Sequence, residues 1–280
     1  MTARPRPSAV AAGAAAVLAT AGLVALATGG TGSPDREPLP SSGSPAAAQA
    51  ISAAPAPTSA AGDAGAREPL SPEALAAGAA AGKWTAQMLR PAMLRTGPGG
   101  PMITRVSRQT GYGIRRVYAV AALRPGWVGV RALQRPNGKL GWLPADVVRL
   151  EPIRMTLVAD LSERELSVRI DGEVRRRFGI GIGRPGSTTP LGRYGVTDRL
   201  RAGRSGAARA AYGCCVLPLT GHQPNPPPGW KGGTRLAIHG TPRPGSVGRA
   251  VSSGCLRMDN RDARRLMASV PLGTTLTVRR

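Results

Sequence analysis

The chain has 280 residues, enough for one or two domains, and carries a formal net charge of +23. The five basic and five acidic residues before Trp84 cancel, so the whole excess lies in residues 84–280. Such a charge attracts polyanions. Only 3% of residues are aromatic and no nucleic-acid-binding motif occurs, so we expect no nucleic-acid partner. The charge fits either an anionic cell envelope as partner or a plain arginine-rich surface.

Residues 1–27 have the layout of a secretory signal. Arg4 and Arg6 precede an uncharged apolar run over residues 9–27, which ends in Ala25-Leu26-Ala27. The run is also about long enough to span a bilayer, so both a cleaved signal peptide and an uncleaved membrane anchor are consistent with it. In either case we expect an exported, extracytoplasmic protein in the cell wall or anchored to the membrane. Three cysteines is an odd number, so at least one is free or bonded to another molecule.

Residues 28–83 are rich in Ala, Pro, Gly and Ser. They hold too few large apolar side chains to offset the entropy of ordering, which predicts a disordered linker. Near its end, Ser71-Pro72-Glu73 is typical of a helix N-terminus and predicts a short helix over residues 71–82.

Residues 84–151 contain short apolar runs broken by Gly, Pro and Asn, which predicts a small β-barrel. Asn137-Gly138 indicates a hairpin turn. The stretch resembles bacterial SH3-like modules through this turn, Gly126-Trp127 and the closing segment Gly141-Trp142-Leu143-Pro144. We expect its tryptophans to form a core rather than a peptide-binding groove.

Residues 152–280 alternate apolar and polar side chains from residue 153 onward, as β-strands do. Asp171-Gly172 lies where a hairpin turn should fall. A buried strand is expected to end at His239-Gly240, after a long irregular stretch. Residues 262–270 have a helical pattern preceded by Asp259 and Asn260 as capping residues. The fold class is therefore mostly β, with one or two helices.

Two side chains in this region form a candidate nucleophile and base. A thiol is mostly protonated at neutral pH, and an imidazole can take its proton. Cys255 follows His239 by sixteen residues. Gly254 permits a tight turn whose backbone N–H groups could bind an oxyanion. Residues 236–258 contain no Asp or Glu, so a backbone carbonyl such as that of Gly240 could orient the imidazole instead.

The block Ser252-Ser253-Gly254-Cys255-Leu256-Arg257, with the upstream His-Gly, resembles the catalytic motif of the L,D-transpeptidases, the YkuD-like family. The resemblance covers roughly residues 153–280 and implies a β-sandwich domain. It implies Cys255 as nucleophile, His239 as general base and acid, and the Gly240 carbonyl as the group that orients the histidine. Ser252, Ser253 and Gly254 would belong to the oxyanion and substrate-binding block, and Arg257 would shape the loop or bind a substrate carboxylate. The family often has His where this chain has Ser253.

The resemblance implies that a peptidoglycan tetrapeptide stem acylates the cysteine and that an acceptor amine takes the acyl group, giving 3-3 cross-links. Donor and acceptor stems would be the partners, and no cofactor or metal is expected. Two alternatives are a cell-wall cysteine peptidase or carboxypeptidase that hydrolyses stems, and a non-catalytic protein that binds the wall.

Three further features are weaker candidates. His222 and Tyr212, like Trp230, are placed at the rim of the cleft as substrate contacts or are merely exposed. The adjacent Cys214 and Cys215 indicate a vicinal disulfide or two unreactive thiols more than a zinc site, because zinc ligands favour a wider cysteine spacing.

Overall fold

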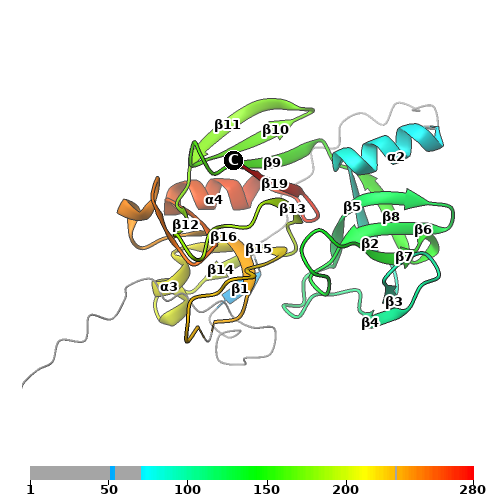
Figure 1. Ribbon diagram of the computed structural model, residues 1–280, viewed down its shortest axis with the longest axis horizontal. Helices are drawn as coiled ribbons and strands as arrows, with labels where there is room; N and C mark the ends of the chain where they lie inside the picture. Colours follow the sequence, from blue (N-terminus) through cyan, green and yellow to red (C-terminus); the bar gives the residue numbers. More distant parts are fainter. Residues whose placement is uncertain (1–50, 54–70, 231) are drawn as a thin grey trace, which may run out of the picture. The chain divides into compact units, whose positions relative to one another are not determined.

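The computed structural model describes residues 51–53, 71–230 and 232–280 (Figure 1). The expected signal peptide or anchor at residues 1–27, and much of the expected linker, lie outside the described residues. Within the described part of the chain, none of the helices is both long and apolar enough to cross a membrane.

Two elements lie inside residues 28–83, the stretch expected to be a linker with a short helix near its end. Helix α2 spans Pro72–Ala81, where a helix was predicted; Ser71 Oγ accepts the N–H of Ala74 and Gly82 ends the helix at a φ of 78°. Strand β1 (Ile51–Ala53) pairs antiparallel with β14 of the C-terminal lobe. This strand was not expected, because three residues carry too little pattern.

The upstream lobe, residues 84–152, is one seven-stranded sheet in the order β4-β3-β7-β6-β5-β2-β8. Its own apolar cluster includes Met88, Leu94, Val130 and Leu143. The lobe is a compact β unit as expected, and its SH3-like identity stays a prediction. The strands are β2 (Trp84–Met88), β3 (Ala92–Arg95), β4 (Met102–Val106), β5 (Val117–Arg124), β6 (Trp127–Arg131), β7 (Gly141–Pro144) and β8 (Val148–Pro152), with a 3-10 turn at Ala145–Val147.

The predicted turn at Asn137-Gly138 is part of a longer connection. Strands β6 and β7 pair as expected, but residues 132–140 join them. Lys139 N–H donates to Pro136 O and Gly138 has a φ of 80°, so the turn sits at the tip of this loop. The asparagine-glycine pair therefore predicted the hairpin between these two strands correctly, and the connection is longer than a two-residue turn.

The C-terminal lobe, residues 155–279, is mostly β, as expected. One five-stranded sheet has the order β11-β10-β9-β19-β13 and the other has the order β1-β14-β15-β16-β18. The strands are β9 (Met155–Asp160), β10 (Glu165–Ile170), β11 (Glu173–Gly179), β12 (Ile182–Gly183), β13 (Gly192–Gly195), β14 (Leu200–Ala202), β15 (Cys215–His222), β16 (Arg235–Gly240), β17 (Ala250–Ser252), β18 (Leu256–Met258) and β19 (Thr275–Arg279).

One apolar core fills the space between these two sheets, which makes the lobe a β-sandwich. Leu157 and Leu276 face it from one sheet, and Leu217 and Ile238 from the other. Helix α4 (Asn260–Ser269) contributes Ala263, Leu266 and Met267 to the same core. Asp259 caps this helix through the N–H of Arg261, so it begins two residues before the predicted range.

Two elements of this lobe were missed in the stretch expected to be irregular. Helix α3 (Ala207–Tyr212) is too short to show a helical period. Strand β15 contains Pro218, which argues against a central strand in sequence terms. The register of β15 against β16 shifts between Pro218 and His222, and prolines within sheets are typically found at such irregularities. By contrast, Asp171 and Gly172 form the expected two-residue turn, with positive φ at both positions.

Candidate active site

Parallel pairing of β16 and β18 brings His239 and Cys255 together. In this register Ile238 lies opposite Leu256 and His239 opposite Arg257. Cys255 directly precedes β18 and so lies beside Ala237, with which it shares an apolar cluster. Side chains two residues apart on a strand point to the same face, so His239 and Cys255 share a face. Cys255 is a free thiol and is 7% exposed.

The imidazole of His239 is held on both its edge and its face. Its Nδ1 lies 2.6 Å from the carbonyl oxygen of Gly240, the contact expected from the sequence. A carbonyl only accepts hydrogen bonds, so Nδ1 carries the proton and Nε2 is the nitrogen that can take one. The ring of Tyr212 packs edge-on against the imidazole, with centroids 5.3 Å apart. The histidine is thereby fixed in the tautomer that a general base requires.

The turn before the nucleophile is closed by Ser252. Its hydroxyl donates to the carbonyl of Cys255 at 2.6 Å and accepts the N–H of Gly254 at 3.1 Å. Gly254 has a φ of 121°, a conformation that glycine adopts freely. The Gly254 N–H is thus engaged within the turn, and its expected role toward an oxyanion stays a prediction. Ser252, which is fully buried, shapes the turn instead of contacting substrate.

Gln223 is a site residue that the sequence did not reveal. Its buried amide nitrogen lies 2.9 Å from the carbonyl oxygen of Ser253 and 3.1 Å from those of Ser187 and Thr188. The amide therefore ties the turn that carries Cys255 to the Gly/Pro-rich loop 184–189. No local signal marks it, since a single glutamine after a strand has no motif.

A small pocket opens onto the thiol. It is lined by Cys255 and Ser253, by Gln223, and by residues of the following segment that include Trp230, Thr234 and Leu236. The structure thus places Trp230 at the cleft, in agreement with the sequence analysis, and brings Ser253 into the pocket wall.

Two other expected site residues lie elsewhere than predicted. Tyr212 is buried against His239 and is not at the rim. His222 does not line the pocket at Cys255: its Nε2 lies 2.6 Å from Leu133 O, and its backbone exchanges two hydrogen bonds with the side chain of Asn137. His222 is the last residue of β15, and its bonds to Leu133 and Asn137 connect this strand to loop 132–140 of the upstream lobe.

Arg257 is 3% exposed, and its backbone N–H and carbonyl both bond to Gly181. It pairs with His239 across the two strands, so its side chain leaves the sheet on the face of Cys255. Of the two expected roles, this burial favours shaping the loop over binding a substrate carboxylate.

The upstream lobe also reaches this face. Tyr112 and Ile114, from the loop between β4 and β5, pack against the cluster that contains Cys255 and Tyr212. Burial is the main cause that raises the pKa of Tyr112 above its usual value. Sequence reasoning assigned the loop to the upstream module alone and so missed this contact.

Cys214 and Cys215 form a vicinal disulfide, one of the two alternatives favoured by their spacing. Neither sulfur is then a thiolate ligand. Among the described residues no group of three or more His, Cys, Asp or Glu side chains is placed to hold a metal ion.

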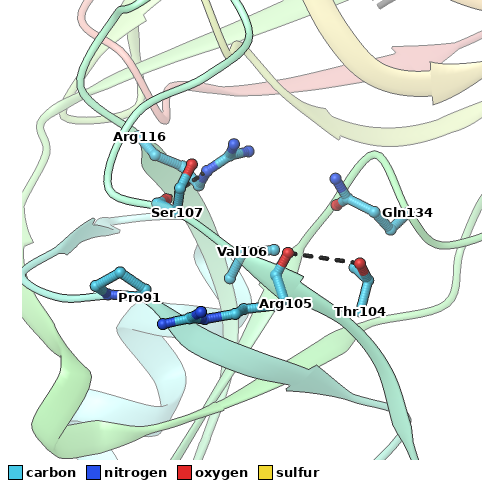
Figure 2. Close-up of a pocket in the computed structure, with 7 residues that line it drawn as sticks. All are labelled: Pro91, Thr104, Arg105, Val106, Ser107, Arg116 and Gln134. Atoms are coloured by element: carbon cyan, nitrogen blue, oxygen red, sulfur yellow. Dashed lines mark hydrogen bonds between the residues drawn. The ribbon is translucent and has the colours of Figure 1, made fainter.

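Another pocket lies in the upstream lobe, and none of its lining residues is shared with the pocket at Cys255 (Figure 2). It has a volume of about 410 Å³ and is lined by Pro91, Thr104, Arg105, Val106, Ser107, Arg116 and Gln134. The guanidinium of Arg116 is fixed by bonds to the carbonyls of Ser107 and Gln109, at 2.8 and 2.7 Å.

Comparison with known proteins identifies the family of the C-terminal lobe. Residues 154–278 match a family model described as the L,D-transpeptidase catalytic domain, YkuD. Two relatives come from Bacillus subtilis (strain 168). The putative L,D-transpeptidase YqjB is 30% identical over 131 residues, which are 44% of this chain and 69% of that protein. The chain belongs to the L,D-transpeptidase family.

The second relative, the putative L,D-transpeptidase YkuD, is 30% identical over 124 residues, 44% of this chain. The chain spans 65% of the length of that relative. A solved L,D-transpeptidase from Mycobacterium tuberculosis H37Rv has a TM-score of 0.38 and 20% identity, over 50% of this chain and 72% of the other. The matched family range contains Cys255, His239 and Gln223, whereas the upstream lobe lies outside it.

Proposed function

We propose that this chain is a peptidoglycan L,D-transpeptidase that forms an acyl-enzyme through Cys255 and transfers the acyl group to an amine, making 3-3 cross-links. The observation that carries the proposal is the free, buried thiol on the same sheet face as an imidazole held by a backbone carbonyl. Membership of the L,D-transpeptidase family supports peptidoglycan stems as donor and acceptor.

In the first half-reaction, Nε2 of His239 takes the thiol proton and the thiolate attacks a carbonyl of the donor tetrapeptide. The tetrahedral intermediate collapses when the imidazolium returns that proton to the departing amine. In the second half, the acceptor amine attacks the thioester and loses its proton to the same Nε2. The sulfur leaves and regains a proton, so the enzyme is restored without a net change.

Two groups of the turn at Cys255 bear on this chemistry. With the Gly254 N–H engaged, the N–H of Cys255 is the backbone donor that we assign to the oxyanion. Ser253 faces the pocket where relatives in the family often carry histidine, so it should affect substrate fit more than the chemical step.

The test is incubation of the full chain with a purified tetrapeptide stem and, separately, with imipenem, with products read by mass spectrometry. The expected result is a covalent imipenem adduct and stem dimers, both absent in Cys255→Ala. Tripeptide without dimers would assign the chain to stem hydrolysis. No adduct and no turnover would leave only the non-catalytic, wall-binding alternative and would refute the proposal.

We further propose that the enzyme acts outside the cytoplasm. Residues 1–27 have the pattern of a signal peptide or membrane anchor. The proposed substrate, the stem peptide of peptidoglycan, also lies outside the cytoplasm. Fractionation of cells that produce the full chain tests this: a wholly cytoplasmic protein would exclude export.

The upstream lobe is proposed to contact an anionic envelope polymer through the pocket of Figure 2. Residues 84–152 carry eleven basic and two acidic residues, so the lobe has a net charge of +9. The pocket is lined by two arginines and no acid, and its size is that of a ligand site. Arg105→Gln with Arg116→Gln should weaken binding to isolated cell walls more than a matched pair, Arg124→Gln with Arg149→Gln. Equal losses would refute a specific site.

A further inference from the structure

The vicinal disulfide is a reactive group near the active site that the proposed mechanism does not use. Cys214 and Cys215 are 7% and 1% exposed and lie at the start of β15. Tyr212, two residues before the pair, and Val216, directly after it, both lie against His239. The disulfide therefore lies within the segment that fixes the general base.

Both ends of that segment reach the histidine. On one side Tyr212 packs its ring edge-on against the imidazole. On the other side Val216 pairs with His239 across β15 and β16. A bond between the two sulfurs closes a small ring over the peptide that joins Cys214 to Cys215, so rotation of the backbone between Tyr212 and Val216 is restricted.

A second path runs from Cys214 to the carbonyl that orients the base. The N–H of Cys214 donates to Asn260 Oδ1 at 2.7 Å, and Asn260 Nδ2 donates to Thr241 O at 2.8 Å. A Cβ added at Gly240 would lie 2.3 Å from Asn260 Oδ1 and 3.2 Å from Cys214 Sγ. Cys214 and Asn260 are thus packed directly on the backbone of Gly240, whose carbonyl holds His239 Nδ1.

We propose that the Cys214–Cys215 disulfide is a positioning element for His239, and that its reduction lowers the rate at which Cys255 is acylated. The reductant is a dithiol: two electrons and two protons pass to the cystine, the S–S bond breaks, two thiols form, and the dithiol becomes a disulfide. The two sulfurs, no longer bonded, must separate to van der Waals contact in a fully packed region. Tyr212 on one side and Gly240 on the other then shift.

The effect should appear in the chemical step. Displacement of a catalytic group by about 1 Å can cost up to about 100-fold in rate, and a shift smaller than that predicts a loss of about tenfold. The inference rests on the proposed function, because acylation of Cys255 is its main readout. Alkylation of Cys255 by iodoacetamide gives a second readout that needs only a thiol and its base.

The experiment uses the full chain in two redox states. Thiols are first counted after denaturation: the oxidised protein should show one and the protein treated with dithiothreitol three. After the reductant is removed without air, imipenem acylation and iodoacetamide alkylation are followed by intact mass across pH 5–9. Thermal melting is recorded in parallel. Reoxidation should restore the original rate.

The matched control is Cys214→Ser with Cys215→Ser, which keeps side-chain size and cannot form the bond. It should react at the rate of the reduced wild type and be insensitive to dithiothreitol, which separates the disulfide from any oxidation at Cys255. Three thiols in the protein as isolated, or equal rates in both redox states, would overturn the proposal. Oxidised protein that is alkylated by iodoacetamide but not acylated by imipenem would count against the proposed function alone.

Discussion

The glutamine that ties the nucleophile turn to loop 184–189 gives the sharpest test of how the site is held. Gln223→Glu keeps the shape of the side chain but replaces its two N–H donors by oxygen. The new carboxylate would face the carbonyl oxygens of Ser187, Thr188 and Ser253, which lie 2.9–3.1 Å from the present nitrogen. An attractive contact thus becomes a repulsive one without a change in volume.

The expected loss of stability can be estimated from the hydrogen bonds that Gln223→Glu removes. Two N–H groups can make two full hydrogen bonds, each worth about 0.5–1.5 kcal/mol net, and the carbonyls they leave are unsatisfied. Gln223 is 5% exposed, so the added charge is also desolvated. We expect the free energy of unfolding to fall by about 2–4 kcal/mol. If the turn moves by about 1 Å, acylation of Cys255 should slow by up to about 100-fold.

Burial raises the pKa of a carboxyl group, and the surrounding carbonyls favour its protonated form, which can donate one hydrogen bond. The Glu variant should therefore recover part of its stability and acylation rate as the pH falls from 8 to 5. Denaturant unfolding and imipenem acylation at each pH provide the measurement. Gln134→Glu, at an exposed position, is the control. If both variants behave alike at every pH, Gln223 does not hold the turn.

Three further predictions concern the base, the turn before Cys255 and a buried ion pair of the C-terminal lobe. His239→Gln should slow acylation by at least about 100-fold through loss of the base, measured by intact mass, while melting changes little. Gly254→Ala should lose about 1–3 kcal/mol, because its φ is 121° and the new Cβ would lie 2.3 Å from Gln223 Nε2; unchanged unfolding in urea would contradict this. Asp198→Asn removes a carboxylate that is 1% exposed and lies 3.2 Å from Arg235 Nη2, so the half-buried guanidinium loses its ion-pair partner. The substitution should cost about 3–5 kcal/mol in urea.

Local patterns predicted the parts of the fold that depend on local physics. Ser71 as a cap, Asp171-Gly172 as a hairpin turn and Asp259 as the start of α4 each depend on a few neighbouring atoms. Strand β15 failed because its identity depends on neighbours far along the chain. Pro218 argues locally against a strand, yet hydrogen bonds to β14 and β16 on either side keep the segment extended.

The same division explains the site. Cys255, His239 and Gly240 could be proposed because they form a compact motif with a known chemistry. Gln223 and the contact of Tyr112 with the catalytic face could not, since neither depends on sequence neighbours. His222 was misplaced for the same reason: its role is set by Leu133 and Asn137, about 85 or more residues away in a different lobe.

A histidine oriented by a backbone carbonyl depends on its surroundings differently from one oriented by a carboxylate. A carboxylate can be positioned by its own side-chain torsions, whereas the carbonyl of Gly240 goes only where the end of β16 goes. That end is fixed by β18 on one side and by the packing of Cys214 and Asn260 on the other. Residues that never touch substrate therefore decide whether Nδ1 stays protonated and Nε2 stays available to the thiol. The absence of an acidic side chain between residues 236 and 258 moves the control of the base from one side chain to the packing of two strands and a helix terminus.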